Sequence, residues 1–362
     1  MTYTTSKISI WAFWLPIVAS CQPQEPDPGT PRILYDSGSN PSVDSDSATP
    51  DTSDTDTFPG QFSISSTELN DGYGSTVAVS GIGVWAGAPH GDVPTIYAIS
   101  STGSTPVVQG EGRLGASLIA TQDGFVAGAP LANESRGMIV DQDGQTFLED
   151  GQSTGLAVAA DSIWVAAGAT GWTDESGQTF SSEHRPASIS ICGEKVGLGF
   201  PHGTNAALLD GISVQHEYPH DEMGFSLACG DLDGDANTDW VVGAPGSNTV
   251  YRLEESDADT LDVVSAWQST GRFGHAVAVA DIDGDGFDDV IIGAPMTDDH
   301  VTGAVSLFLG SDLETPAYTW KGALAGEQAG FGVAMAEGVL AFGAPGGGYT
   351  TGTVTVVPWQ TR

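Results

Sequence analysis

The sequence predicts an all-β fold: a seven-bladed β-propeller with four-stranded antiparallel blades, closed by an N-terminal strand in the last blade. A triplet of Gly, a second residue and Pro (once Thr) recurs seven times, at steps of 31 to 50 residues. Short alternating runs of small and apolar residues precede these triplets, and no stretch shows a sustained helical period. One unit of this length cannot bury both faces of its sheet, so the units are expected to stack around an axis. The triplets begin at Gly87, Gly128, Gly168, Gly199, Gly243, Gly293 and Gly343.

Each unit is interpreted as successive strands. The first is an alternating run rich in Ala, Ser and Gly, such as residues 74–79 or 274–280, because small side chains suit the crowded place nearest the axis. The second, such as residues 290–292, ends at the triplet, where Pro stops strand pairing and Gly adopts backbone angles that other residues avoid. A third strand, such as residues 304–308, follows, and several units show a less regular fourth.

The fourth unit has the weakest pattern. Residues 189–201 align with residues 77–89 without a gap, but the segment before them, residues 171–183, is short and irregular. We count this unit and retain seven.

The two ends of the repeat region complement each other. After the last triplet there is room for one more strand, residues 353–357, which leaves the last sheet one strand short. Residues 62–64 with Leu69 form an unassigned strand before the first unit. If this strand completes the last sheet, the ring closes and no open edge is left.

The chain is strongly acidic, with 47 Asp and Glu against 10 Lys and Arg in 362 residues. Nucleic acid would be repelled by this charge, and electrostatic docking to anionic lipid is likewise unfavourable. The charge suits cation binding, and a solvated acidic surface without a specific partner explains it equally well.

The N-terminus indicates export. Residues 1–20 are interpreted as a lipoprotein signal peptide, with Lys7 before the apolar run 8–18, and residues 18–21 resemble a bacterial lipobox with Cys21 as the lipidation site. An ordinary secretory signal is the alternative. Residues 21–60 are rich in Ser, Thr, Asp and Pro and predict a disordered acidic tether, while residues 61–362 form the propeller. We therefore expect an exported protein, lipid-anchored to the cell envelope at the outer membrane or cell surface.

Two further cysteines, Cys192 and Cys229, occur in the same local context of consecutive units. In an exported protein they could form a disulfide between neighbouring units. The alternative is two small buried residues, each facing its own sheet.

Two Asp-rich stretches share one spacing, with carboxylates at positions 1, 3, 5 and 9. We call them the first Asp loop (residues 231–239) and the second Asp loop (residues 281–289). Such crowding is repulsive unless a hard cation neutralises it, and oxygen-only ligands around a Gly turn indicate Ca²⁺. Two Ca²⁺ sites are predicted; the alternative is a pair of Asp-Gly turns without metal. The expected ligands are Asp231, Asp233, Asp235, Asp239, Asp281, Asp283, Asp285 and Asp289, with the backbone carbonyls of Asn237 and Phe287 at position 7.

These residues together resemble a known family. Phe225 after Gly224, Phe273-Gly274, Phe331-Gly332, the Asp loops and the Gly-Ala-Pro triplets are similar to the FG-GAP repeat of integrin α subunits, over residues 61–362. The resemblance implies a propeller of seven repeats, calcium loops between the first and second strands of certain blades, and ligand-binding loops on the opposite face. This chain lacks the stalk domains of an integrin, so it looks like a bacterial lipoprotein that carries only the propeller.

The expected function is recognition or adhesion, with an unknown protein or glycan as ligand and the membrane contacted through the lipid anchor. Exposed aromatic candidates for the contact are Trp172, Tyr218 and Tyr349. The alternative is a hydrolase at the propeller axis or in the blade loops, where His216 and His220 are the nearest approach to a cluster. We expect no enzyme, since the inner strands are mostly Ala, Val and Ser.

Overall fold

The computed structural model describes residues 60–132, 137–148, 164–165, 171–174, 179–181, 186–193, 195–203, 205–215, 218–257, 260–346 and 351–359. The signal peptide, Cys21 and the tether lie outside these residues. Over the described residues the fold is strands and turns, with one short 3₁₀ helix, η1 (Pro219–Asp221). None of the described helices has the length and hydropathy needed to cross a membrane.

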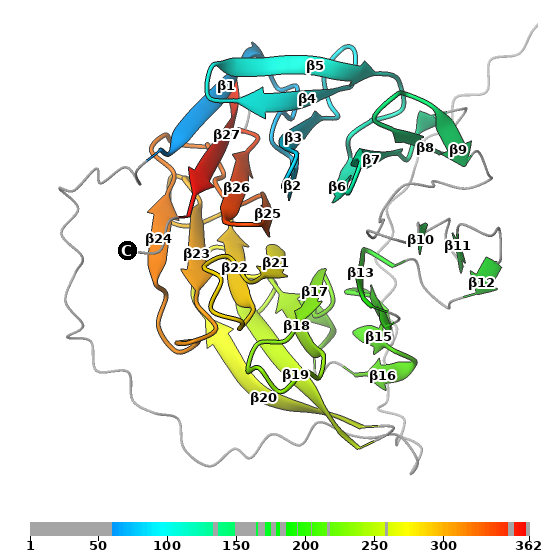
Figure 1. Ribbon diagram of the computed structural model, residues 1–362, viewed down its shortest axis with the longest axis vertical. Helices are drawn as coiled ribbons and strands as arrows, with labels where there is room; N and C mark the ends of the chain where they lie inside the picture. The colour runs from blue at the N-terminus through cyan, green and yellow to red at the C-terminus, as the bar shows by residue number, and fades with distance from the viewer. Residues whose placement is uncertain are drawn as a thin grey trace, which may run out of the picture. The chain divides into compact units, whose positions relative to one another are not determined.

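The strands form antiparallel sheets in which sequence neighbours pair (Figure 1). We name each blade after its first strand, which lies innermost. The β2 blade contains β2 (Thr76–Ser80), β3 (Gly83–Ala88), β4 (Thr95–Ser100) and β5 (Gly103–Gln109). The β6 blade contains β6 (Ser117–Thr121), β7 (Gly124–Ala129), β8 (Met138–Asp141) and β9 (Thr146–Leu148). The β13 blade contains β13 (Ser188–Cys192), β14 (Lys195–Gly199), β15 (Ala207–Leu209) and β16 (Ile212–Val214).

The C-terminal half holds three more blades. The β17 blade contains β17 (Ser226–Gly230), β18 (Asp239–Ala244), β19 (Thr249–Asp257) and β20 (Thr260–Gln268). The β21 blade contains β21 (Ala276–Ala280), β22 (Asp289–Ala294), β23 (Ala304–Phe308) and β24 (Tyr318–Lys321). The β25 blade contains β25 (Gly332–Ala336), β26 (Val339–Ala344), β27 (Thr351–Pro358) and, from the other end of the chain, β1 (Phe62–Leu69).

The described residues thus form six four-stranded blades, and the prediction of seven was wrong in number. Between the β6 and β13 blades in sequence lies a three-stranded sheet of β10 (Trp164–Val165), β11 (Gly171–Asp174) and β12 (Thr179–Ser181). Residues 149–163, which precede this sheet, lie outside the described residues. This unit has Thr154 in place of Phe and Thr170 in place of Pro, although the sequence pattern is weakest in the unit that follows it.

The predicted closure by the N-terminal strand is confirmed. Strand β1 pairs antiparallel with β27, with Phe62 opposite Val356 and Ile64 opposite Val354, and the two strands run side by side in Figure 1. The hydroxyls of Ser63 and Thr355 lie 2.8 Å apart. The last blade therefore has no unpaired β27 edge.

The triplet glycines lie where the backbones of neighbouring blades make close contact. A Cβ added at Gly243 would overlap the carbonyl oxygen of Gly274 at the start of the next blade's inner strand. A Cβ added at Gly343 would likewise overlap the carbonyl oxygen of Gly74, and this contact lies between the last blade and the first. Side chains are excluded there because two backbones touch, and this explains why Gly recurs in the triplets. The same contact recurs at Gly87 with Gly115, Gly199 with Gly224, and Gly293 with Gly330.

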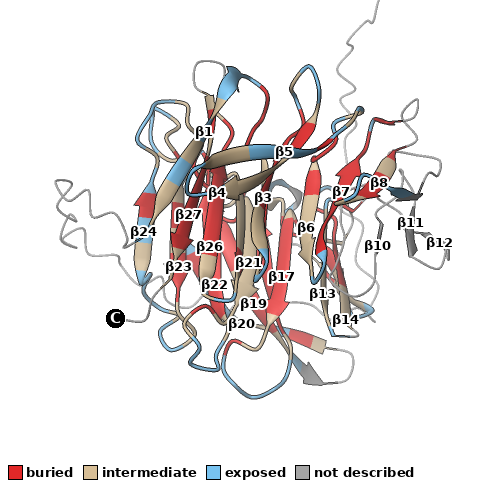
Figure 2. Ribbon diagram, turned by 45° about the horizontal axis from the view of Figure 1, so that its top comes forward, coloured by how far each residue is buried: buried red, intermediate tan, exposed pale blue. Residues whose placement is uncertain are grey.

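The hydrophobic core lies between blades. One cluster joins Val77 and Ala86 of the β2 blade to Ala341 and Val354 of the β25 blade. Buried residues run along the strands and exposed residues gather in the turns (Figure 2). Because each blade buries its faces against its neighbours, no single blade has a complete core of its own.

A cavity of about 310 Å³ lies among the inner strands and is lined by residues of all six four-stranded blades. Most of its lining is Ser, Ala and Val, as the composition of the inner runs predicts. The disulfide Cys192–Cys229 joins the inner strands β13 and β17, with Cα atoms 6.1 Å apart. The two cysteines are one position out of register, because Cys192 lies four residues after Ser188 while Cys229 lies three residues after the equivalent Ser226. The inner strands still approach closely enough for the bond, so the disulfide between neighbouring units, the first of the two alternatives, is present.

Candidate metal centre

Both Asp loops connect the first strand of a blade to its second, in neighbouring blades. The first Asp loop joins β17 to β18, and the second joins β21 to β22. The loops contact each other: Asp231 N donates to Asp288 Oδ2, and Asp288 N donates to the Asp231 carbonyl, both at 2.8 Å. The two candidate sites therefore share one structural unit on one face of the propeller, which we call the metal-loop face.

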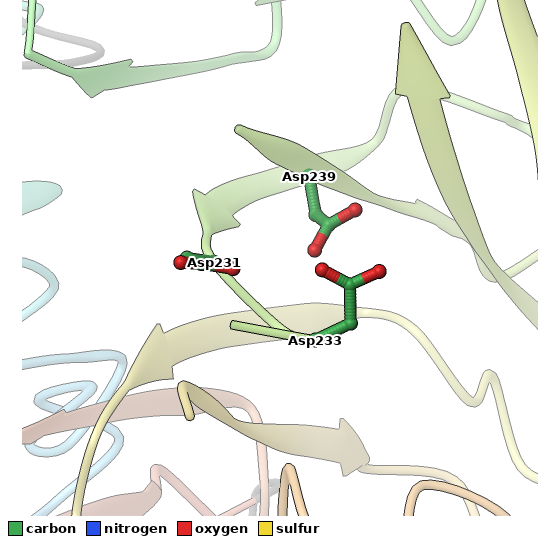
Figure 3. Close-up of side chains that lie close together, drawn as sticks. All are labelled: Asp231, Asp233 and Asp239. Carbon is green, nitrogen blue, oxygen red and sulfur yellow. The ribbon is translucent and has the colours of Figure 1, made fainter. Parts of the chain in front are cut away.

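The first Asp loop brings carboxylates of Asp231, Asp233 and Asp239 within 4.8 Å of one another. Figure 3 shows Asp233 and Asp239 pointing toward each other, with Asp231 beside them. Asp235 is outside this group because it pairs with Asn237, accepting from that residue's backbone N at 2.8 Å and its side-chain Nδ2 at 2.7 Å.

The second Asp loop groups Asp281, Asp283 and Asp285 within the same limit of 4.8 Å. Asp289 is outside the group; it is fully buried and accepts from Ile282 N at 2.7 Å and Gly310 N at 2.8 Å. The structure thus assembles three of the four predicted carboxylates in each loop, and a different member is left out of each.

Backbone hydrogen bonds shape both turns. Asp231 Oδ1 accepts from Gly234 N at 2.8 Å, and Asp281 Oδ1 accepts from Gly284 N at 2.7 Å. Both glycines have a positive φ, of 75° and 79°, which Gly adopts without strain. The Asp-x-Asp-Gly pattern therefore forms the same turn twice and leaves carboxylate oxygens facing its centre.

The electrostatics of the second loop favour a bound cation. Burial raises the pKa of Asp283, and the nearby Asp285 and Asp281 raise it further. Burial raises the pKa of Asp289 to about 6, although Gly310 and Ile282 donate to it. The Asp283 carboxylate, which belongs to the group, therefore carries an energetic cost when ionised that a divalent cation would offset, and carboxylate oxygens are the ligands that Ca²⁺ prefers.

The first loop holds a cationic side chain that sequence reasoning missed. Arg252 of β19 donates from Nε to Asp239 Oδ1 at 3.1 Å and from Nη2 to Asp233 Oδ2 at 2.7 Å. Burial raises the pKa of Asp239 to about 6, while Leu232 N and Arg252 act in the opposite direction. Arg252 lies 13 residues beyond Asp239 in sequence, and only strand pairing brings it to the loop.

The position-7 residues lie at the edge of their loops. Phe287 has an exposed side chain, and a Cβ at Gly234 of the first loop would come within 2.7 Å of its ring. Asn237 is likewise exposed. For both, the backbone N donates to the Asp two residues earlier. The ligand role expected for their backbone carbonyls stays a prediction.

The comparison with protein families supports the architecture. Residues 273–308 match the model of the FG-GAP repeat family. The match and the fold support an FG-GAP β-propeller. No curated protein matches the chain. The matched FG-GAP repeat contains the whole second Asp loop and the Gly293 triplet, whereas the first Asp loop lies outside it.

The structure corrects the alignment of the Phe residues among the blades. Phe273 precedes a positive-φ glycine, Gly274, and is buried between blades. Phe225 and Phe331 follow their glycines instead, and they line the axial cavity on either side of His275. The ring centroids of Phe225 and Phe331 lie 4.9 and 4.5 Å from that of His275. Residues equivalent to Phe273 are Tyr73, Leu114, Met223 and Ala329, each immediately before its glycine.

His275 is the only ionisable side chain among the described residues that line the axial cavity. Its Nδ1 lies 3.1 Å from the Phe331 carbonyl oxygen, and burial lowers its pKa to about 4. Of the loop histidines considered for a hydrolase, His220 is exposed in η1, and His216 lies outside the described residues. Trp172 lies in β11, Tyr218 is exposed before η1, and Tyr349 is outside the described residues.

Proposed function

We propose that this FG-GAP β-propeller is an exported, lipid-anchored recognition module that binds Ca²⁺ and displays loops to a protein or glycan partner. The observation that carries the proposal is a difference between the two faces of the ring. In each blade the connections between strands 2 and 3 and between strand 4 and the next blade lie opposite the metal-loop face, because the strands alternate in direction. We call this side the display face.

The exposed large apolar side chains in connections favour the display face. Tyr218 and Leu324, each 58% exposed, precede the inner strands β17 and β25, and Met296 follows β22. The metal-loop face has Ile82 and Phe287. Exposed apolar side chains gathered on one side of a rigid scaffold are typical of a contact surface. The display-face residues are Leu69, Val93, Leu131, Tyr218, Met296 and Leu324.

Calcium would stabilise this scaffold without taking part in the contact. Asp281, Asp283 and Asp285 would hold the ion, and it would supply the positive charge that three converging carboxylates need. The two Asp loops lie between inner and second strands, so an ordered loop fixes both strands of its blade.

Export and anchoring rest on the sequence of residues 1–60 and gain support from the disulfide Cys192–Cys229, since disulfides persist in oxidising compartments. Acylation at Cys21 would be detected by mass spectrometry of the mature chain, and Cys21→Ser is expected to release the protein from the membrane fraction. Retention of the variant in that fraction would contradict the anchor.

A loss-of-binding experiment tests the recognition proposal. A glycan array and a cross-linking assay on intact cells would first identify a ligand for the full chain. The triple variant Tyr218→Ser, Met296→Ser, Leu324→Ser is then expected to weaken binding about 100-fold or more, because three interface anchors at about 1–2 kcal/mol each contribute about 3–6 kcal/mol. Ile82→Ser on the metal-loop face is the matched control and should bind as the unmodified protein does. Unchanged binding by the triple variant, or hydrolysis of the ligand, would contradict the proposal.

A further inference from the structure

The two Asp loops have the same spacing but different neighbours on the third strand. In the β17 blade, Arg252 of β19 lies opposite Val241 of β18. The equivalent pair in the β21 blade is Leu307 of β23 opposite Ile291 of β22. A guanidinium thus stands beside the first loop at the place where the second loop has a buried aliphatic side chain.

Arg252 uses the oxygens that a cation in the first loop would need. It donates to Asp239 Oδ1 and Asp233 Oδ2 and also pairs with Glu254, and its side chain is only 10% exposed. Asp239 accepts from Leu232 N at 2.7 Å through its other oxygen, so both of its oxygens are engaged. A guanidinium keeps its charge at every accessible pH, and it cannot vacate the loop by losing a proton.

In the second loop the corresponding carboxylate is satisfied by backbone. Asp289 Oδ1 accepts from Gly310 N at 2.8 Å, in place of the Arg252 contact that Asp239 makes. Within the described parts of the chain, no Lys or Arg forms an ion pair with Asp281, Asp283 or Asp285. Their shared negative charge is therefore left for an ion from solution.

The geometry points to Arg252 as a built-in counter-cation of the first Asp loop, in the place that Ca²⁺ takes in the second. The chain then binds a single Ca²⁺, in the second loop, whereas its sequence predicts one ion in each of the two loops. This inference deepens the calcium part of the proposed function and rests on it for the second loop only. A first loop neutralised by a side chain holds its shape whether calcium is present or absent.

Two matched variants separate the loops. Asp233→Asn and Asp283→Asn change the same position of each loop. By isothermal titration of the full-length, metal-stripped protein with CaCl₂, we expect one ion for the unmodified protein, one for Asp233→Asn and none for Asp283→Asn. In EDTA the melting temperature should fall for Asp233→Asn, which loses an Arg252 partner, and should rise or stay level for Asp283→Asn, which loses a repulsive charge.

The complementary variant is Arg252→Leu, which copies Leu307 of the second loop. We expect this variant to have a lower melting temperature than the unmodified protein in EDTA and to bind two ions. Its melting temperature should also rise more than that of the unmodified protein when calcium is added. If Arg252→Leu does not fold in EDTA, refolding with CaCl₂ is expected to yield the two-ion form, and the two Asp variants carry the test alone.

Two results would overturn the role of Arg252. One is binding of two ions to the unmodified protein with loss of one in Asp233→Asn. The other is a fall in melting temperature of the same size for both Asp variants in EDTA. If no variant binds calcium but the two Asp variants still shift in the expected directions, the calcium part of the proposed function fails and the role of Arg252 stands.

Discussion

At the scale of single residues, the aromatic neighbours of His275 could not be predicted from the sequence, because they come from two other blades. It lies between Phe225 and Phe331, with Arg272 5.4 Å from the Phe225 ring centroid and paired to Glu222. Burial lowers its pKa from 6.5 to about 4; Arg272 adds to this shift, and the Phe331 carbonyl and Glu222 oppose it. The unfolded chain therefore binds a proton between these values that the folded protein does not. The stability that this neutral His contributes is present above pH 6.5 and is lost as the pH falls toward 4.

His275→Phe should remove this pH dependence. Phe is the residue found at the equivalent positions in the neighbouring β17 and β25 blades, so the ring stack is kept. Between pH 7 and pH 5, the free energy of unfolding of the unmodified protein should fall by about 2 kcal/mol more than that of the variant. Urea unfolding at the two pH values measures the difference. His300→Gln, at an exposed turn, is the control, and an equal fall in all three proteins would contradict the assignment.

Residue roles were predictable from the sequence only where local spacing determines them. The Asp-x-Asp-Gly spacing identified both loops because their turns are made by hydrogen bonds within nine residues. Arg252 could not be found this way, since strand pairing brings it to Asp239. The Phe residues were misaligned by two positions because Gly precedes and follows Phe331, and the sequence alone does not show which Gly has the positive φ.

At the scale of the elements, the triplet glycines form the close backbone contacts between neighbouring blades, which we call joints. The repeat was found from these triplets, and the structure gives their physical cause, which is contact between two backbones. The number of four-stranded blades was not predictable, because the stretch around Gly168 has the triplet glycine but not the Pro or the regular strand spacing of the other units.

Gly243→Ala should break one such joint. Its Cβ would overlap the Gly274 carbonyl and the Ser226 hydroxyl, and neither strand can move without losing the Ser226 Oγ to Gly274 O hydrogen bond of 2.8 Å. We expect a loss of about 1–3 kcal/mol or more in the free energy of unfolding. Gly91→Ala is the matched control: its nearest neighbour would be the Asp71 Cβ at 3.5 Å, an ordinary contact. Equal stability of the two variants, measured by urea unfolding, would show that the joint tolerates a side chain.

At the scale of the whole molecule, the ring is closed by pairing of β1 with β27. This closure was predictable because the repeat pattern leaves the last sheet one strand short and one strand before the first unit unassigned. Deleting residues 61–70 removes β1 and exposes the hydrogen-bonding edge of β27. It also removes Phe62 and Ile64, which pack against the cluster that joins the first and last blades. We expect a loss on the order of 5 kcal/mol and a melting temperature lower by about 10 °C or more.

A peptide supplied in trans tests whether this loss comes from the missing strand. A synthetic peptide of residues 61–70 should restore most of the melting temperature of the deletion variant in proportion to its concentration, because it can pair with β27 in the native register of Phe62 with Val356. A peptide with Phe62 and Ile64 replaced by Ser keeps the backbone donors and acceptors but not the apolar side chains, and it should restore much less. An unchanged melting temperature after the deletion, or equal rescue by both peptides, would show that the ring does not depend on β1. Since the β25 blade meets the β2 blade through Gly343 and Gly74, β1 completes the blade that lies next to the first one in the ring.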